Sequence, residues 1–162
     1  MDHVRMVINY GQSRKYHHDL VGWNARLDTL QAGILLAKLQ HLNEWNERRR
    51  NNAVYYRKIL NGLPVVLPTE RNDCRHIYHL FVIQCDHRDE LLSFLADKGI
   101  SCGIHYPIPI HFQKAFACLD YAKGTFPIAE QQAGRILSLP MCAELSHEQM
   151  DYIADSFSAF FN

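Results

Sequence analysis

The chain has 162 residues, a length that suits one domain with its own hydrophobic core. Apolar residues make up 48% and charged residues 21%, which is a globular composition without the signature of disorder. Lysine plus arginine equals aspartate plus glutamate at 17 each, so no overall positive charge favours nucleic acid. No window has the roughly 18 consecutive apolar residues of a membrane helix, and the first residues do not read as a signal peptide. The composition therefore argues against nucleic-acid and membrane partners.

The amino-terminal part of the chain changes from a weak pattern to a strong helical one. Residues 2–9 could end a helix or a strand, and the polar segment Gln12 to Leu20 is expected to be a loop. From Leu27 to Leu60, apolar residues recur at steps of three and four, which predicts helix. A single helix this long is unusual, so we expect a helix across Leu27 to Leu42 and a break near Leu42 to Asn46.

After Pro68 the pattern alternates between strands and helices. Strands are expected at Ile77–Gln84, Ile100–Ile104 and Ile136–Leu139, and helices at Arg88–Asp97, Phe126–Arg135 and after Ser146. The last helix begins with the capping-box pattern of a serine followed three residues later by a glutamine, Gln149. The fold class is therefore α/β, more closely an α+β domain with a small, mainly antiparallel sheet.

Cysteine and histidine patterns do not predict a metal site. The five cysteines are odd in number and contain no C-x-x-C pair, which fits reduced thiols in a cytoplasmic protein. Among the ten histidines, His76 and His79 are closely spaced, but an offset of three in a strand places side chains on opposite faces. No cysteine pair completes a tetrahedral set, so no metal is predicted.

Several blocks of the sequence resemble one family. Gly22-Trp23-Asn24-Ala25-Arg26-Leu27-Asp28-Thr29-Leu30-Gln31-Ala32 is similar to the G-x-N-x-R-L-D-x-L-Q-A segment of the DegT/DnrJ/EryC1/StrS sugar aminotransferases. The resemblance continues, in the family's order, through residues 76–83, 104–113, 125–130 and 136–141. It implies a pyridoxal 5′-phosphate (PLP) enzyme of the aspartate-aminotransferase fold (type I), of which this chain is the carboxyl-terminal part. Residues 1–26 would end the large domain, 27–62 form the long connecting helix region, and 63–162 form the small domain.

The resemblance also implies a function and a missing residue. The family transfers an amino group, typically from glutamate, to a nucleotide-linked keto sugar in surface polysaccharide or amino-sugar biosynthesis. Its Schiff-base lysine lies well upstream of the position of Asn24, and Lys15 matches a different, polar K-Y pair. The chain is therefore expected to be a fragment that is inactive alone, in a homodimer or with a large-domain partner chain. One half of a split aminotransferase and a non-enzymatic binding or regulatory module stay open as alternatives.

Asn24 and Arg26 are the candidate cofactor-binding residues. An amide and a guanidinium two residues apart in an extended loop can address one phosphate, because arginine offers forked donors and asparagine a directional one. The resemblance implies that the asparagine reaches the cofactor phosphate of the neighbouring subunit. The other interpretation is an ordinary helix entry, in which Arg26 pairs with Asp28.

Tyr16, His105 and Tyr106 are the candidate substrate-binding residues. His105 and Tyr106 directly follow an expected strand, and Pro107 and Pro109 restrict the backbone of their loop. The resemblance implies that this stretch approaches the active site, where a histidine can bond a sugar hydroxyl or a diphosphate. A purely structural loop is an equally good interpretation.

Overall fold

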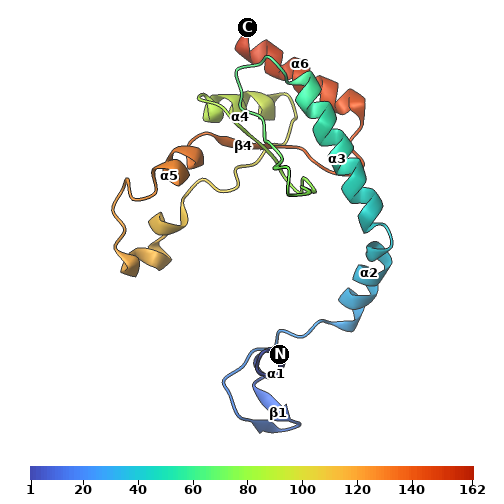
Figure 1. Ribbon diagram of the computed structural model, residues 1–162, viewed down its shortest axis with the longest axis vertical. Helices are drawn as coiled ribbons and strands as arrows, with labels where there is room; N and C mark the ends of the chain where they lie inside the picture. Colours follow the sequence, from blue (N-terminus) through green and yellow to red (C-terminus); the bar gives the residue numbers. More distant parts are fainter. The chain divides into compact units, whose positions relative to one another are not determined.

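A computed structural model describes residues 1–162 of the chain (Figure 1). It consists of two compact units, Met1–Asn43 and Glu44–Asn162, and each is described by itself. No helix in either unit has the length and apolar content needed to cross a membrane.

The first unit contains two helices and a small hairpin. Helix α1 spans Asp2–Ile8, strands β1 and β2 span Gln12–Arg14 and His17–His18 and pair antiparallel, and α2 spans Thr29–Leu39. The hairpin corrects the expectation of a loop from Gln12 to Leu20. Its turn contains Tyr16 at φ 69°, a backbone conformation that residues other than glycine, asparagine and aspartate rarely adopt. The turn therefore has no glycine or asparagine signal that would reveal it in the sequence.

Helix α2 begins at a side-chain cap and exposes its apolar residues. The carboxylate of Asp28 accepts a hydrogen bond from the amide of Leu30 at 2.9 Å, which satisfies one of the free donors at the helix start. The helix ends at Leu39 instead of Leu42, and α3 begins at Leu42 after two intervening residues. The expected break exists, slightly before the predicted range. No residue of α2 is buried within this structure.

The second unit carries the core. Its elements are α3 (Leu42–Ile59, whose first two residues belong to the first unit), β3 (Phe81–Gln84), α4 (Arg88–Asp97), the 3-10 turns η1 (Ile110–Phe112) and η2 (Lys114–Leu119), α5 (Pro127–Ala133), β4 (Ile136–Leu139) and α6 (His147–Phe161). Strands β3 and β4 pair antiparallel, with Phe81 opposite Leu139 and Ile83 opposite Leu137. Helices α3, α4 and α6 gather around this pair (Figure 1). The fully buried side chains include Tyr56, Phe81, Ile83, Leu91, Leu95, Leu137, Met150 and Phe157.

The structure confirms the predicted fold class and most predicted elements of this unit. Helix α4 and strand β4 have the predicted bounds, and α5 lies within the predicted range. The capping box of α6 is complete: the amide of Gln149 donates to the Ser146 hydroxyl at 3.2 Å, and the Ser146 amide donates to the Gln149 side chain at 3.0 Å.

Two predicted strands are wrong in extent. The strand expected at Ile77–Gln84 begins only at Phe81, because Tyr78 lies at φ 49° and its amide donates to the Nδ1 of His76 instead of a neighbouring strand. The strand expected at Ile100–Ile104 is reduced to one bridge, between Gly103 and Ser138. Apolar composition alone predicted strand there, but most backbone groups of the segment find no partner strand.

Candidate functional site

The loop from Gly22 to Arg26 lies along the end of α1 in the first unit. The amide of Trp23 donates to the carbonyl of Val7 at 2.7 Å, and the amide of Ala25 donates to the carbonyl of Ile8 at 2.9 Å. A Cβ at Gly22 would lie 2.7 Å from the same Val7 oxygen, so this close approach requires glycine. The helix end therefore holds the loop backbone in place on both sides of Asn24.

The structure brings Asn24 and Arg26 together. The Nε of Arg26 donates to the Oδ1 of Asn24 at 3.4 Å, and the guanidinium lies over the ring of Tyr10, 5.6 Å from its centre. Asp28 makes no ion pair with Arg26, since its carboxylate caps Leu30 at the start of α2. The structure thus lacks the Arg26–Asp28 pair that the helix-entry interpretation required.

A polar hollow of about 370 Å³ lies beside these residues, bounded by Asn24, Arg26, Leu27, Asp28 and Thr29. A guanidinium, an amide and a hydroxyl form a donor set that suits a phosphate group, and the start of α2 adds partial positive charge. The carboxylate of Asp28 opposes this, although it is engaged as the helix cap. The donor set therefore fits the phosphate end of the implied cofactor and offers nothing for its aldehyde.

Tyr16 lies apart from these residues within the same unit. It sits at the turn between β1 and β2 with 78% of its surface exposed, and the Nζ of Lys15 lies 5.2 Å from its ring centre. No hydrogen bond or ring contact joins Tyr16 to Asn24 or Arg26. Its assignment as a substrate contact stays a prediction.

His105 and Tyr106 lie in the second unit, directly after the bridge between Gly103 and Ser138. The Nδ1 of His105 lies 2.9 Å from the Ser138 hydroxyl oxygen. The ring of Tyr106 meets that of His105 edge to face, with centres 5.6 Å apart, and 75% of Tyr106 is exposed. The histidine is therefore anchored, whereas the tyrosine hydroxyl is open to a ligand.

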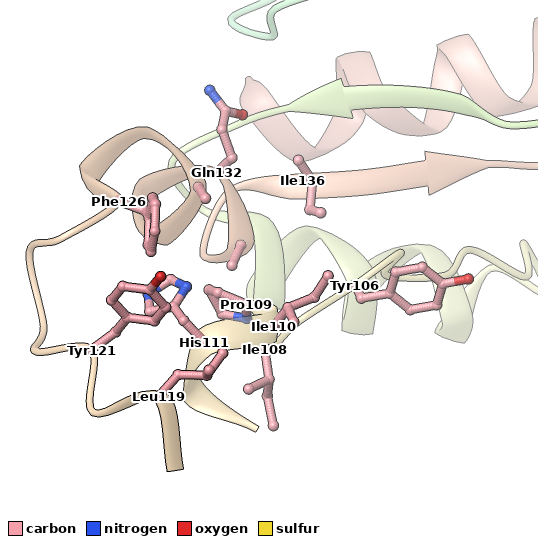
Figure 2. Close-up of a pocket in the computed structure, with 12 residues that line it drawn as sticks. Tyr106, Ile108, Pro109, Ile110, His111, Leu119, Tyr121, Phe126, Gln132 and Ile136 are labelled. Carbon is pink, nitrogen blue, oxygen red and sulfur yellow. The ribbon is translucent and has the colours of Figure 1, made fainter. Parts of the chain in front are cut away.

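A cavity of about 470 Å³ continues from Tyr106 along the same loop (Figure 2). Figure 2 shows His111, Tyr121 and Phe126 grouped at one end and Tyr106 at the other. The side chains that line this cavity are mostly apolar. No pattern in the sequence reveals this cavity, because its walls come from the loop after His105, from η2 and from α5, and no spacing in the sequence relates them.

His111, which lines this cavity, is hydrogen-bonded to a carboxylate behind it. The Nε2 of His111 donates to Glu130 at 3.1 Å, and their side chains are only 7% and 12% exposed. Burial raises the pKa of the Glu130 carboxyl, but hydrogen bonds from the amides of Gly124 and Phe126 and from His111 outweigh it, so the pKa lies below its ordinary value. His111 thus supports Glu130, which in turn binds the backbone of the loop at residues 124–126. This structural role accounts for His111 without a bound ligand.

The chain matches the model of the DegT/DnrJ/EryC1/StrS aminotransferase family over residues 1–158. The chain belongs to this family. It is 42% identical over 159 residues to the erythromycin biosynthesis sensory transduction protein EryC1 of Saccharopolyspora erythraea, covering 98% of this chain and 43% of that protein. It is 44% identical over 151 residues to the UDP-N-acetyl-3-dehydro-alpha-D-glucosamine 3-aminotransferase of Acidithiobacillus ferrooxidans, covering 93% and 40%.

Solved structures agree with this family assignment. DesV of S. venezuelae, solved in complex with a ketimine intermediate, superimposes with a TM-score of 0.92 at 38% identity, covering 99% of this chain and 44% of DesV. The DegT/DnrJ/EryC1/StrS aminotransferases depend on PLP, as the resemblance implied. The chain spans about two fifths of the length of the relatives it matches.

Proposed function

We propose that this chain supplies the phosphate-contacting loop and the small domain of a PLP-dependent aminotransferase acting on a nucleotide-linked keto sugar. The observation that carries the proposal is the pairing of Asn24 with Arg26 on a loop that the end of α1 holds in place. When bound, PLP supplies an electron sink for the exchange of the amino group, which we take to come from glutamate.

The residues of this chain would bind and orient, and none of them is assigned a proton transfer. Arg26 and Asn24 would hold the cofactor phosphate. In a homodimer, this would be the phosphate of the cofactor bound to the neighbouring subunit. His105, Tyr106 and Tyr16 would contact the nucleotide sugar. The exposure of Tyr106 and the anchoring of His105 support their part of the assignment.

The lysine that bonds to PLP would come from outside these 162 residues. The chain has six lysines, and each of them is exposed: Lys15, Lys38, Lys58, Lys98, Lys114 and Lys123. A lysine that forms a Schiff base is activated by desolvation or by a neighbouring cation, which an exposed position does not provide. We therefore propose that the chain alone is inactive and acts with a large domain, as the greater length of the relatives supports.

Helix α2 supports the need for such a partner. The large apolar residues of α2 point to several sides of the helix, and each of them is more than half exposed: Leu30, Ile34, Leu35, Leu36 and Leu39. A helix that is apolar all round is normally enclosed by protein. We propose that the large domain encloses it, with residues 1–26 belonging to that domain, 27–62 connecting and 63–162 forming the small domain.

A regulatory role is the second candidate. One relative, of which this chain matches 43%, is named as a sensory transduction protein, and the exposed lysines suit a module without catalysis.

In either role the five free cysteines fit a reducing cytoplasm, which we propose as the location.

Mixing this chain with a separately produced large domain of a family member distinguishes the two roles. The enzymatic proposal predicts that the mixture, PLP and glutamate convert a nucleotide-linked keto sugar to its amino sugar, while neither part does so alone. Formation of a stable PLP-containing complex without any conversion of UDP- or dTDP-linked keto sugars would favour the regulatory role instead.

A further inference from the structure

The ring of His105 is held by Ser138, a buried residue of β4, which is hydrogen-bonded on both sides, to β3 and to Gly103. Ser138 lies in the middle of β4 and is 4% exposed. Its amide donates to the carbonyl of Gly103 at 2.7 Å, and the amide of Gly103 donates back to the Ser138 carbonyl at 3.0 Å. The hydroxyl oxygen lies 2.9 Å from the Nδ1 of His105. The sheet thus fixes the hydroxyl that meets the imidazole.

Gly103 leaves the space that the same ring occupies. A Cβ at this position would lie 2.8 Å from the Cε1 of His105 and 3.5 Å from its Nδ1. Only a residue without a side chain leaves room for the ring where it lies. One hydrogen bond from β4 and the space beside Gly103 therefore favour this orientation of the imidazole.

The hydrogen-bond inventory of Ser138 determines which ring nitrogen carries the proton. The hydroxyl has no other hydrogen-bond partner in the chain. If Nδ1 carried the proton, it would donate to the serine, and the buried hydroxyl hydrogen would have no acceptor, which is costly. Ser138 therefore donates to Nδ1, and the proton of the neutral imidazole lies on Nε2.

We propose that Ser138 is a positioning residue which, with the space left by Gly103, holds His105 as an Nε2–H donor for an oxygen of the nucleotide sugar. His105 is exposed, and its Nε2 makes no hydrogen bond within the chain, so this N–H is available to a ligand. A neutral donor suits a diphosphate oxygen or a sugar oxygen equally. The ligand part of this inference rests on the proposed function, whereas the tautomer does not.

The tautomer is measured on the whole chain by long-range ¹H–¹⁵N correlation spectra of the histidine rings. We expect an unprotonated Nδ1 and a protonated Nε2 for neutral His105. Ser138→Ala should shift the Nδ1 signal, Ser138→Thr should preserve it, and Ser156→Ala should leave it unchanged, since Ser156 is an equally buried serine that bonds Tyr152 in α6. A protonated Nδ1 in the unsubstituted chain would overturn the inference.

Gly103→Ala is a second way to disturb the contact between His105 and Ser138, and it replaces the Ser138 variants if these fold poorly. The three atoms nearest to its new methyl group all belong to the ring of His105 and none to the backbone, so we expect the ring to be displaced from Ser138 while the backbone stays. We expect the chain to remain folded and the Nδ1 signal to shift as in Ser138→Ala. An unchanged Nδ1 signal in folded Gly103→Ala would contradict the proposed contact.

Kinetics of the chain completed with a large domain test the ligand part. Loss of one neutral hydrogen bond should raise the KM for the nucleotide sugar about two- to tenfold in Gly103→Ala, with kcat nearly unchanged. His105→Ala should do the same, and the double variant should be no worse than His105→Ala alone. Additive effects would overturn the positioning role.

Inhibition by the free nucleoside diphosphate then identifies the oxygen. If His105→Ala weakens this inhibition by the same factor by which it raises KM, the Nε2–H of His105 binds the diphosphate. If the inhibition is unchanged, the Nε2–H binds an oxygen of the sugar. A completed enzyme that acts on no nucleotide sugar would refute the proposed function, while the NMR spectra would still decide the tautomer.

Discussion

Helices α2 and α6 are both rich in apolar residues, but the chain buries only one of them. In α6, Met150, Ile153, Ala154 and Phe157 are buried against the core of the second unit. Helix α2 buries no residue, and Leu30 remains 74% exposed. The difference teaches that the core of the second unit is encoded within the chain, whereas the chain itself does not cover the apolar surface of α2, which is why we propose that the large domain encloses it.

The largest expected effect compares one core position in α6 with one position in α2. Phe157→Ala should lower the free energy of unfolding of the second unit by about 3–5 kcal/mol, because a fully buried ring leaves a cavity. Ile34→Ala should change it by less than about 0.5 kcal/mol, because Ile34 is half exposed. Urea unfolding followed by circular dichroism measures both. Equal losses would show that α2 packs within the chain.

Self-association sharpens the same comparison. Because the apolar residues of α2 are uncovered, we expect the isolated chain to associate with itself or to bind a hydrophobic dye. Leu35→Glu places a charge among those residues and should reduce both effects. Gln31→Glu adds the same charge at a polar position of the same helix and serves as the control. A monodisperse monomer at high concentration that binds no dye would count against an uncovered α2.

The effect of pH on the second unit should be smaller. The hydrogen bond from Arg50, joined by one from the amide of His76, lowers the pKa of Glu70 from its ordinary value of 4.5 to about 2. Since the pKa is lower in the folded state, the stabilisation by Glu70 is complete above pH 4.5 and is lost as the pH falls toward 2. Urea unfolding at pH 7, 4 and 2.5 should show Glu70→Gln converging on the unsubstituted chain. A constant difference would contradict the assigned role of Arg50.

Local signals in the sequence predicted the second unit better than the first. The bounds of α4 and the capping box of α6 follow from short-range patterns, and the structure confirms both. The hairpin at Gln12–His18 was missed because its turn depends on Tyr16 at positive φ, which sequence rules disfavour. The strand at Ile100–Ile104 was overpredicted because pairing depends on a partner strand, which reaches only Gly103.

The candidate site shows the same division. Asn24 and Arg26 were singled out because they lie two residues apart in a segment that resembles the family, and in the structure their side chains meet. Their role at a cofactor phosphate stays a prediction. The contact of His105 with Ser138 joins residues 33 apart in the sequence, and the pair of His111 with Glu130 joins residues 19 apart. Neither spacing has a periodic signature, so only the folded chain reveals these partners.

Cofactor retention by the completed enzyme tests the central claim most directly. A charge-assisted bond to phosphate contributes about 1.5–3 kcal/mol, so Arg26→Ala should weaken PLP retention by roughly one to two decades, and Asn24→Ala by less. Arg5→Ala, which removes an exposed arginine from the same unit, is the matched control and should retain PLP like the parent. Equilibrium dialysis of PLP against each completed variant gives the answer. If Arg26→Ala and Asn24→Ala bind PLP as tightly as the parent, the loop from Gly22 to Asp28 is only a helix entry.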